Sequence, residues 1–222
     1  MVGLQPLELR ILVRIQVPEP KQITLNWGDL FCALTIVDFG NVEKWKFSLG
    51  WSIDINNLSR LIKRFSLNRQ SNRRFYYGSD YGKDEKATIL FEWSRLILER
   101  AQWNKLEVVT KRVKYIHSPD NKFGFEKKCD LDVEMAIDLI KYRDDYDTIV
   151  LFSGDGDLMH AIRYLKDRYG KDCMVFGARN HVGREVFDAQ LDGYVNKIFF
   201  VEDFEYRLRM DRFGHGSQKT VR

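Results

Sequence analysis

The sequence predicts an α/β protein, a three-layer sandwich in which helices cover both faces of a central, mostly parallel β-sheet. Between residues 33 and 201, short apolar runs alternate with longer segments whose apolar residues recur at helical spacing. Strands that alternate with helices are joined by right-handed crossovers, which place helices on both faces of a parallel sheet. The length of 222 residues suits one domain with a normal core.

Three strands and two helices are expected in the first part of this region. Residues 33–37 are mostly apolar or β-branched, which predicts a buried strand. Residues 53–65 place leucine, isoleucine and phenylalanine on one side of a helix. An aromatic run at residues 75–77 predicts the second strand, and an apolar run at residues 106–109 predicts the third. Residues 84–103 are expected to form a long helix between them.

The second part begins with residues 117–128, which are expected to form a loop because they are polar and contain proline and glycine. Residues 132–142 then carry apolar side chains at helical spacing. The apolar run at residues 148–152 predicts a buried parallel strand. A helix expected at residues 158–169 ends at Gly170, the residue type that most often closes a helix.

The last three elements continue the alternation. Strands are expected at residues 173–176 and 198–201, and a short helix at residues 186–191 lies between them. We find no internal repeat in the chain.

The chain divides into three parts by composition. Residues 1–31 alternate partly and are interrupted by Pro18 and Pro20, which predicts an added hairpin or a loosely attached extension of unknown role. Residues 32–204 form the expected α/β domain. Residues 205–222 are a basic tail, which is most simply a disordered end; an arm that tethers RNA is the alternative.

Composition also limits the class of protein. A hydrophobic content of 44% indicates a globular chain, and 36 Lys and Arg against 32 Asp and Glu permit a polyanionic partner without requiring one. The three cysteines are far apart and lack ligand spacing, so neither a zinc site nor a disulfide framework is expected. No apolar stretch reaches the roughly 18 residues of a membrane span, and no signal peptide is evident. We therefore expect a soluble, cytoplasmic protein without a membrane partner.

Acidic residues follow or precede the predicted strands at one edge of the sheet. Asp155 and Asp157 lie in a glycine turn directly after the strand at residues 148–152, and Asp38 follows the first strand. Asp132 opens the helix that leads into residues 148–152, and such a helix starts at the same edge. Ligands collect outside the carboxyl ends of parallel strands, so we expect these four acids to converge there.

Two interpretations of these acids are open. Each acid could be an ordinary strand end, helix cap or Asp/Gly turn residue. A convergent cluster, however, would be stable mainly when a divalent cation neutralises it, because close carboxylates repel one another. Ligands that are all oxygen select Mg²⁺ or Mn²⁺, and such a metal can activate a water and stabilise the leaving oxygen of a phosphodiester.

The predicted acidic residues lie in three motifs: Asp38-Phe-Gly-Asn41, Asp132 followed by Ala136-Ile137-Asp138, and Ser153-Gly-Asp-Gly-Asp157. Together these motifs resemble those of a known family, the NYN group of PIN-like ribonucleases. The resemblance covers about residues 33–202, and the last motif is the most specific. It implies a compact PIN-like α/β sandwich with a central parallel sheet and an acidic pocket that binds Mg²⁺ or Mn²⁺ for RNA cleavage.

The resemblance also implies roles for individual residues. The catalytic and metal-binding residues would be Asp38, Asp132, Asp155 and Asp157. Asn41 and Ser153 would be polar companions that orient a ligand, water or phosphate.

One departure from the family pattern leaves a choice. The family usually has one acid before the central helix, whereas this chain has both Asp130 and Asp132. The spacing to Asp138 favours Asp132, and Asp130 is a substitute or helper. Asp138 lies on another side of the helix and is expected to be solvated. Asp192 resembles a late acidic position of the family without an assigned role.

Basic residues near the acidic centre would supply the affinity for phosphates. The candidates for nucleic-acid binding are Lys122, Lys127, Lys128, Arg179 and Arg184. A second basic cluster contains Lys63, Arg64, Arg69, Arg73 and Arg74. The aromatic residues beside this cluster are expected mainly in the core, although aromatic rings near basic residues can stack unpaired bases.

These observations favour a metal-dependent endoribonuclease that acts on single-stranded or structured RNA. A non-catalytic RNA-binding or regulatory module is the main alternative. A phosphatase or a DNA-directed nuclease could use the same pocket. A homo-oligomer is compatible with the sequence, which does not specify the oligomeric state.

Overall fold

The structure is a computed structural model, and it describes residues 32–65, 72–80, 85–117 and 125–210. The predicted extension at residues 1–31 lies outside these ranges, as do Lys122 and most of the predicted basic tail. The division of the chain into extension, domain and tail therefore stays a prediction.

Six parallel strands form the central sheet, in the order β3-β2-β1-β6-β7-β8. They are β1 (Ala33–Asp38), β2 (Arg73–Ser79), β3 (Glu107–Arg112), β6 (Thr148–Phe152), β7 (Asp172–Gly177) and β8 (Lys197–Phe200). The chain leaves β1 toward one side of the sheet and returns to β6 on the other side. The order therefore reverses between β1 and β6, the position at which such sheets form a crevice at their carboxyl edge.

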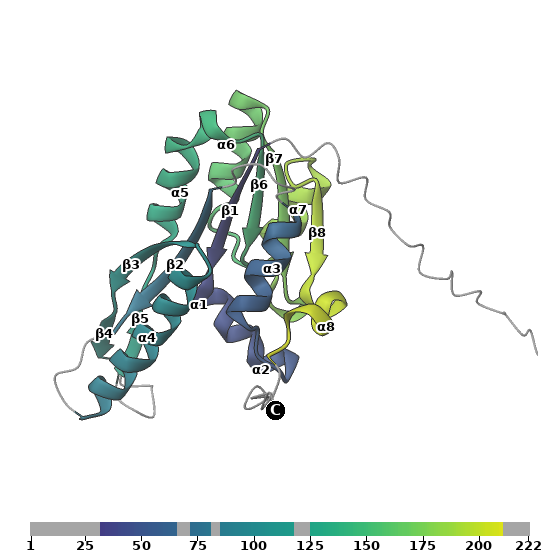
Figure 1. The fold of residues 1–222 in the computed structure, drawn as a ribbon. Helices are drawn as coiled ribbons and strands as arrows, with labels where there is room; N and C mark the ends of the chain where they lie inside the picture. Colours follow the sequence, from purple (N-terminus) through teal and green to yellow (C-terminus); the bar gives the residue numbers. More distant parts are fainter. Residues whose placement is uncertain (1–31, 66–71, 81–84, 118–124, 211–222) are drawn as a thin grey trace, which may run out of the picture.

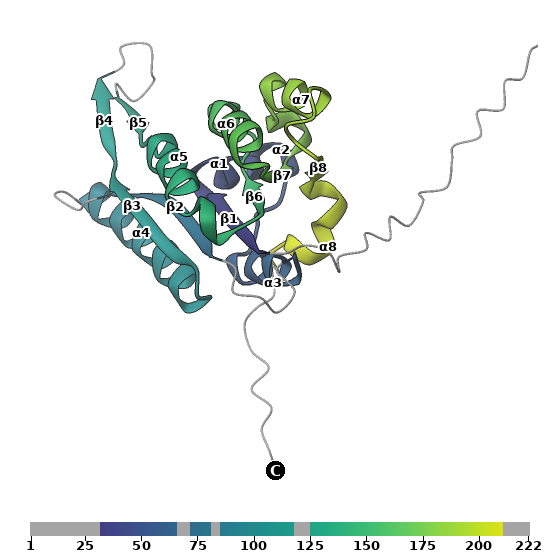
Figure 2. The same ribbon diagram turned by 90° about the horizontal axis from the view of Figure 1, so that it is seen from above.

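Helices cover both faces of this sheet, which confirms the three-layer α/β sandwich (Figures 1 and 2). One face carries α3 (Ile55–Phe65), α4 (Glu85–Trp103) and α8 (Glu205–Leu208), and the other carries α5 (Asp132–Lys141), α6 (Met159–Tyr169) and α7 (Arg184–Leu191). Single-turn 3₁₀ helices follow α5, β7 and β8: η3 (Arg143–Asp145), η4 (Arg179–His181) and η5 (Val201–Phe204).

The core consists of two apolar layers, one on each face of the sheet. Every residue of β6 is buried, as expected for a central parallel strand. Successive side chains alternate between the layers, so Val150 and Phe152 join the α3 side while Ile149 joins the α5 side. Phe75 and Tyr77 are buried on the α3 side, which confirms that they belong to the core.

The segment after β1 folds into short helices that the sequence did not predict. They are α1 (Phe39–Val42), η2 (Glu43–Trp45) and α2 (Lys46–Leu49). Gly50 ends α2 with a φ of 71°, a conformation that favours glycine. Each helix is one turn long, too short for apolar residues to show a helical period. The fully buried Trp45 anchors the segment to the core.

The prediction of a loop at residues 117–128 was wrong for His117 and for residues 125–128, which lie in strands, and residues 118–124 lie outside the described ranges. β4 (Lys114–His117) and β5 (Phe125–Lys128) form a separate antiparallel ribbon. In Figure 2 this hairpin rises from the β3 edge of the sheet toward the α5 face. All four residues of β4 are exposed, so this strand has no buried face that would require an alternating apolar pattern.

The described fold continues beyond residue 204, where the predicted tail begins. Leu208 of α8 is fully buried, and Arg209 forms an antiparallel bridge with Ile53. This pairing holds Ile53 in an extended conformation. It explains why the helix predicted from residue 53 begins at Ile55 instead.

Helix α4 carries apolar residues on two sides. Ile97, Leu98 and Ala101 pack against the core, whereas Trp93 and Trp103 are exposed. The helix itself was predicted correctly. Within the described ranges, no helix combines the length and the apolar character needed to cross a bilayer.

Candidate metal centre

The loops that follow β1 and β6 lie side by side at the carboxyl edge of the sheet. The two strands pair in parallel, and Val37 is opposite Phe152 in the register. Asp38 and the turn after Phe152 are therefore neighbours, although they are more than 100 positions apart in the chain. A cavity of about 760 Å³ opens at this edge, and its acidic lining comprises Asp38, Glu43, Asp130, Asp132, Asp155 and Asp157.

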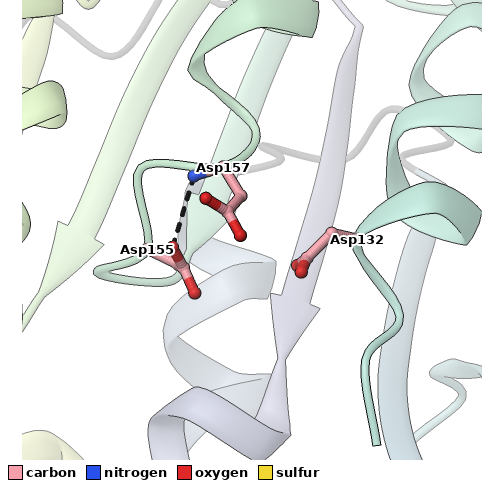
Figure 3. Close-up of side chains that lie close together, drawn as sticks. All are labelled: Asp132, Asp155 and Asp157. Atoms are coloured by element: carbon pink, nitrogen blue, oxygen red, sulfur yellow. Dashed lines mark hydrogen bonds between the residues drawn. The ribbon is translucent and has the colours of Figure 1, made fainter.

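Three of the four predicted acids form a compact cluster. One carboxylate oxygen each of Asp132, Asp155 and Asp157 lies within 4.8 Å of the others. Figure 3 shows Asp155 and Asp157 on the turn after β6 and Asp132 at the start of α5, with their side chains directed toward a common point. The Asp157 N–H donates a hydrogen bond of 3.3 Å to Asp155 Oδ1, which helps to hold this turn.

Close backbone packing explains the glycine between Ser153 and Asp155. A Cβ atom on Gly154 would lie 1.9 Å from the His181 carbonyl oxygen, so no other residue fits this backbone. The Gly154 carbonyl also accepts a hydrogen bond of 2.8 Å from the Gly183 N–H. The loop after β7 thus clamps the turn that carries the two aspartates.

Asp38 lies beside this cluster as a half-buried fourth acid. Its Oδ1 accepts a hydrogen bond of 3.1 Å from the Asn41 N–H, and its Oδ2 accepts one of 3.1 Å from the Ser153 hydroxyl. Burial raises the pKa of Asp38 above its usual value, and the charge of Asp155 adds to this rise. Asp38 lines the same cavity but is not part of the three-oxygen group.

The side-chain oxygens of Asn41 and Ser153 form hydrogen bonds within the protein, and Asn41 also lines the cavity. The Asn41 side-chain oxygen accepts hydrogen bonds from the Gly154 N–H at 3.1 Å and from the Trp45 indole at 2.8 Å. The fully buried Ser153 hydroxyl donates to Asp38 and accepts from the Asp155 N–H at 3.2 Å. Both residues therefore tie the β1 loop to the β6 loop.

The carboxyl of Asp132 binds its proton unusually tightly. Partial burial, a hydrogen bond with Asp130 and the charges of Asp130, Asp38 and Asp155 raise the pKa of Asp132 to about 7. The same hydrogen bond lowers the pKa of Asp130, so Asp130 is the ionised member of the pair. The Asp132 N–H also donates to Asp130 Oδ1 at 3.2 Å.

The donor set of the cluster fits a hard divalent cation. Within the residues that the structure describes, none of Asp132, Asp155 and Asp157 forms an ion pair with lysine or arginine. Three carboxylates without a cationic partner repel one another, and the charge of Asp155 adds to the burial, the Asp130 hydrogen bond and the charges of Asp130 and Asp38 that raise the pKa of Asp132. Oxygen ligands of this kind select Mg²⁺ or Mn²⁺.

The predicted nucleic-acid contacts are spread over several places. Lys128 lines the cavity, whereas Lys122 and the Lys127 side chain lie outside the described residues. The Arg179 guanidinium pairs with Asp203 at 2.8 Å, which neutralises it. Arg184 is exposed on α7 and does not line the cavity.

Two predictions about polar residues away from the cluster were wrong. Asp138 is buried rather than solvated, and Arg74 is buried against it rather than available to RNA. Arg74 Nη2 lies 2.9 Å from Asp138 Oδ2, which also accepts a hydrogen bond of 2.7 Å from the Tyr76 hydroxyl. Asp80, which directly follows β2, is a buried carboxylate that accepts a hydrogen bond from the Tyr115 hydroxyl.

Other cavity residues were not predicted at all. Lys44, Lys46 and Phe47 come from the short helices after β1, and Ile116 comes from the hairpin. Their position in the chain could have indicated the residues after β1, because residues 39–49 directly follow the strand that ends at Asp38.

Asp192, the late acid of the family resemblance, forms an ion pair of 3.1 Å with Arg163.

Comparisons with known proteins agree with this geometry. A family model described as the NYN domain matches residues 35–196. The low amplitude and bright protein LabA of Synechococcus elongatus is 42% identical over 89 residues, which are 40% of this chain and 47% of LabA. The match thus spans about half the length of that relative.

A solved structure has the same fold. The crystal structure of a Vibrio parahaemolyticus protein of unknown function superposes with a TM-score of 0.57 at 20% identity. The match covers 78% of this chain and 94% of the other, and it concerns the fold alone. Because the family model covers most of the chain and the predicted motifs lie within it, this protein belongs to the NYN domain family.

Proposed function

We propose that this protein is a metal-dependent endoribonuclease. The observation that carries the proposal is the convergence of three carboxylates within 4.8 Å at the point where the strand order of the sheet reverses. Membership of the NYN family, which resembles PIN-like ribonucleases, supports RNA as the substrate.

The residues of the chain divide into two groups by role. Asp132, Asp155 and Asp157 would hold one or two Mg²⁺ or Mn²⁺ ions. Such an ion supplies Lewis-acid chemistry for the hydrolysis of a phosphodiester bond. Because a ligand carboxyl must be ionised, Asp132 would lose its proton when the ion binds.

The second group would orient these ligands. Ser153 links Asp38 to the backbone of Asp155, and Asn41 holds the backbone of Gly154. Asp38 thus positions the turn and, from the wall of the same cavity, could complete the coordination of an ion. Asp130 would receive the Asp132 hydrogen bond in the absence of metal. Such supporting contacts commonly change metal affinity by about ten- to a hundredfold.

The test is cleavage of labelled single-stranded and structured RNAs by the purified chain. We expect cleavage with Mn²⁺ or Mg²⁺ and none with EDTA. Asp155→Asn should lower the rate more than about a hundredfold, since a ligand matters at least as much as its supporting contacts. Asp144→Asn is the matched control, because Asp144 is an exposed acid that does not line the cavity.

Other outcomes would select a rival function. RNA binding without metal-dependent cleavage would indicate the non-catalytic module. Preferential hydrolysis of DNA or of a phosphate monoester would indicate the DNA nuclease or the phosphatase. Full activity of Asp155→Asn would refute the proposed centre. The cytoplasmic location and self-association stay predictions.

A further inference from the structure

Part of the cavity lining has a chemistry that differs from that of the acidic cluster. It comes from η2, α2 and the β4–β5 hairpin, and both α2 and the hairpin lie toward the carboxyl end of the sheet in Figure 1. Lys44, Lys46 and Lys128 bring positive charge, and Phe47 and Ile116 bring apolar surface. A single cavity therefore combines carboxylates, ammonium groups and an aromatic ring.

Packing against the core does not explain why a phenylalanine stands at position 47. Phe47 is 81% exposed, and α2 contributes no buried residue to the core. Contacts of the neighbouring residues nevertheless hold this segment in place. The Tyr77 hydroxyl donates a hydrogen bond of 2.8 Å to Glu43, and Glu43 forms an ion pair of 3.6 Å with Lys46, the residue before Phe47. The Lys46 ammonium lies 5.3 Å from the centre of the Phe47 ring, on a short helix anchored by the buried Trp45.

This combination matches the chemistry of an unpaired nucleotide. Ammonium groups attract phosphates, and an exposed aromatic ring offers a face on which any base can stack. In a duplex, neighbouring bases cover both faces of each base, so a stacking partner needs a splayed, single-stranded nucleotide. The cavity volume of about 760 Å³ lies within the range of small-ligand sites.

We propose that Phe47 forms a base-stacking subsite beside the metal centre, with Ile116 as a further apolar contact and Lys44, Lys46 and Lys128 on the flanking phosphates. The inference rests on the proposed nuclease function and names the form of RNA that the site takes. An unpaired base held on Phe47 sets the adjacent phosphate against the acidic cluster. Specificity for single strands then arises from the ring and not from the acids.

Binding of a single-stranded oligoribonucleotide that contains the fluorescent base 2-aminopurine tests the proposal. All chains carry Asp155→Asn so that the RNA stays intact. Stacking quenches 2-aminopurine, and we expect Phe47→Ala to lose the quenching and to weaken binding about tenfold. Phe47→Trp should retain both. Tyr206→Ala is the matched control, because Tyr206 is 77% exposed and does not line the cavity.

Each further result has a distinct meaning. Equal binding by Phe47→Ala and Tyr206→Ala would overturn the subsite, as would equal binding of single strands and blunt duplexes to the chain with Phe47 intact. Cleavage that depends on Asp155 but is unaffected by Phe47→Ala would reject the subsite and leave the nuclease intact. Quenching that depends on Phe47 in a chain that cleaves no RNA would support the subsite and reject the nuclease.

Discussion

Two aspartates of the same helix have opposite surroundings. Asp138, in the middle of α5, is only 9% exposed and lies between Arg74 and Tyr76. Asp132, at the first turn of α5, is half-buried and faces Asp155 and Asp157. The helix thus carries one carboxylate whose charge is balanced by the protein and one whose charge is opposed by its neighbours.

The difference separates carboxylates that stabilise the fold from carboxylates that are available to a ligand. A buried charge is tolerated when it is paired and hydrogen-bonded, as Asp138 is. A cluster of like charges costs free energy unless something outside the chain neutralises it. The comparison therefore predicts opposite effects when the two positions are changed in the same way.

The largest difference is expected in RNA cleavage. Asp132→Asn removes a proposed metal ligand and should reduce the metal-dependent rate more than about a hundredfold. Asp138→Asn leaves the cluster intact and should retain cleavage at 25 °C, because domains usually have about 5–15 kcal/mol of stability to spare. Initial rates measured at saturating Mn²⁺, with circular dichroism as a check of folding, distinguish the two. Equal losses in two folded variants would contradict the division of roles.

The next effect concerns stability. Asp138→Asn leaves the buried Arg74 with the exposed Glu107 as its remaining ion-pair partner. We expect the free energy of unfolding to fall by about 3 kcal/mol, the low end for a broken buried pair, because the pair with Glu107 stays. Urea denaturation in EDTA measures this loss. The double variant Arg74→Met with Asp138→Leu should recover part of it, because no buried unpaired charge then remains and Glu107 is exposed. The recovery is incomplete because the buried Tyr76 hydroxyl loses both of its hydrogen-bond partners. A stable single variant would show that the pair contributes little.

Metal binding should stabilise the folded chain by an amount that depends on Asp132 and not on Asp138. At Mn²⁺ concentrations a hundred times the Kd, ligand linkage gives about 2.7 kcal/mol. A thermal shift on addition of Mn²⁺ should appear in the wild type and in Asp138→Asn, and it should disappear in Asp132→Asn. An undiminished shift in Asp132→Asn would place the ion elsewhere.

The same comparison shows what the sequence could predict. The acids after β1 and β6 were placed correctly at one edge because parallel strands end at a common edge, whatever their separation in the chain. The surroundings of Asp138 could not be predicted, because its partners Arg74 and Tyr76 come from β2, 62 or more positions away. Helical periodicity predicts on which side of a helix a residue lies, but it does not predict which residues of other elements pack against that side.

The remaining gaps arise from short or exposed elements. Residues 39–49 form single turns, and β4 is exposed, so neither contains the apolar period from which elements are predicted. These segments supply Phe47 and Ile116, which line the same cavity as the acids. The acidic part of the lining could thus be predicted, and the rest of the lining required the fold.

The smallest expected effect is a stabilisation, and its sign depends on pH. Asp132 has a pKa of about 7 in the folded chain and an ordinary value of 3.8. Between these values the folded state binds a proton that the unfolded state releases, so ionisation of Asp132 progressively destabilises the metal-free fold as the pH rises from about 4 to 7. Below pH 4 the carboxyl is protonated in both states and the penalty is absent.

Asp132→Asn removes this penalty and should make the metal-free chain more stable than the wild type above pH 7. Because the carboxyl is only half-buried and solvent screens its charge, we expect a gain of about 1–2 kcal/mol. The two chains should converge in stability near pH 4, and the matched Asp138→Asn variant should be less stable than the wild type at pH 7. Urea denaturation in EDTA at several pH values tests all three expectations. A loss of stability in Asp132→Asn at pH 8 would mean that Asp132 is a structural carboxylate like Asp138, and the contrast within α5 would disappear.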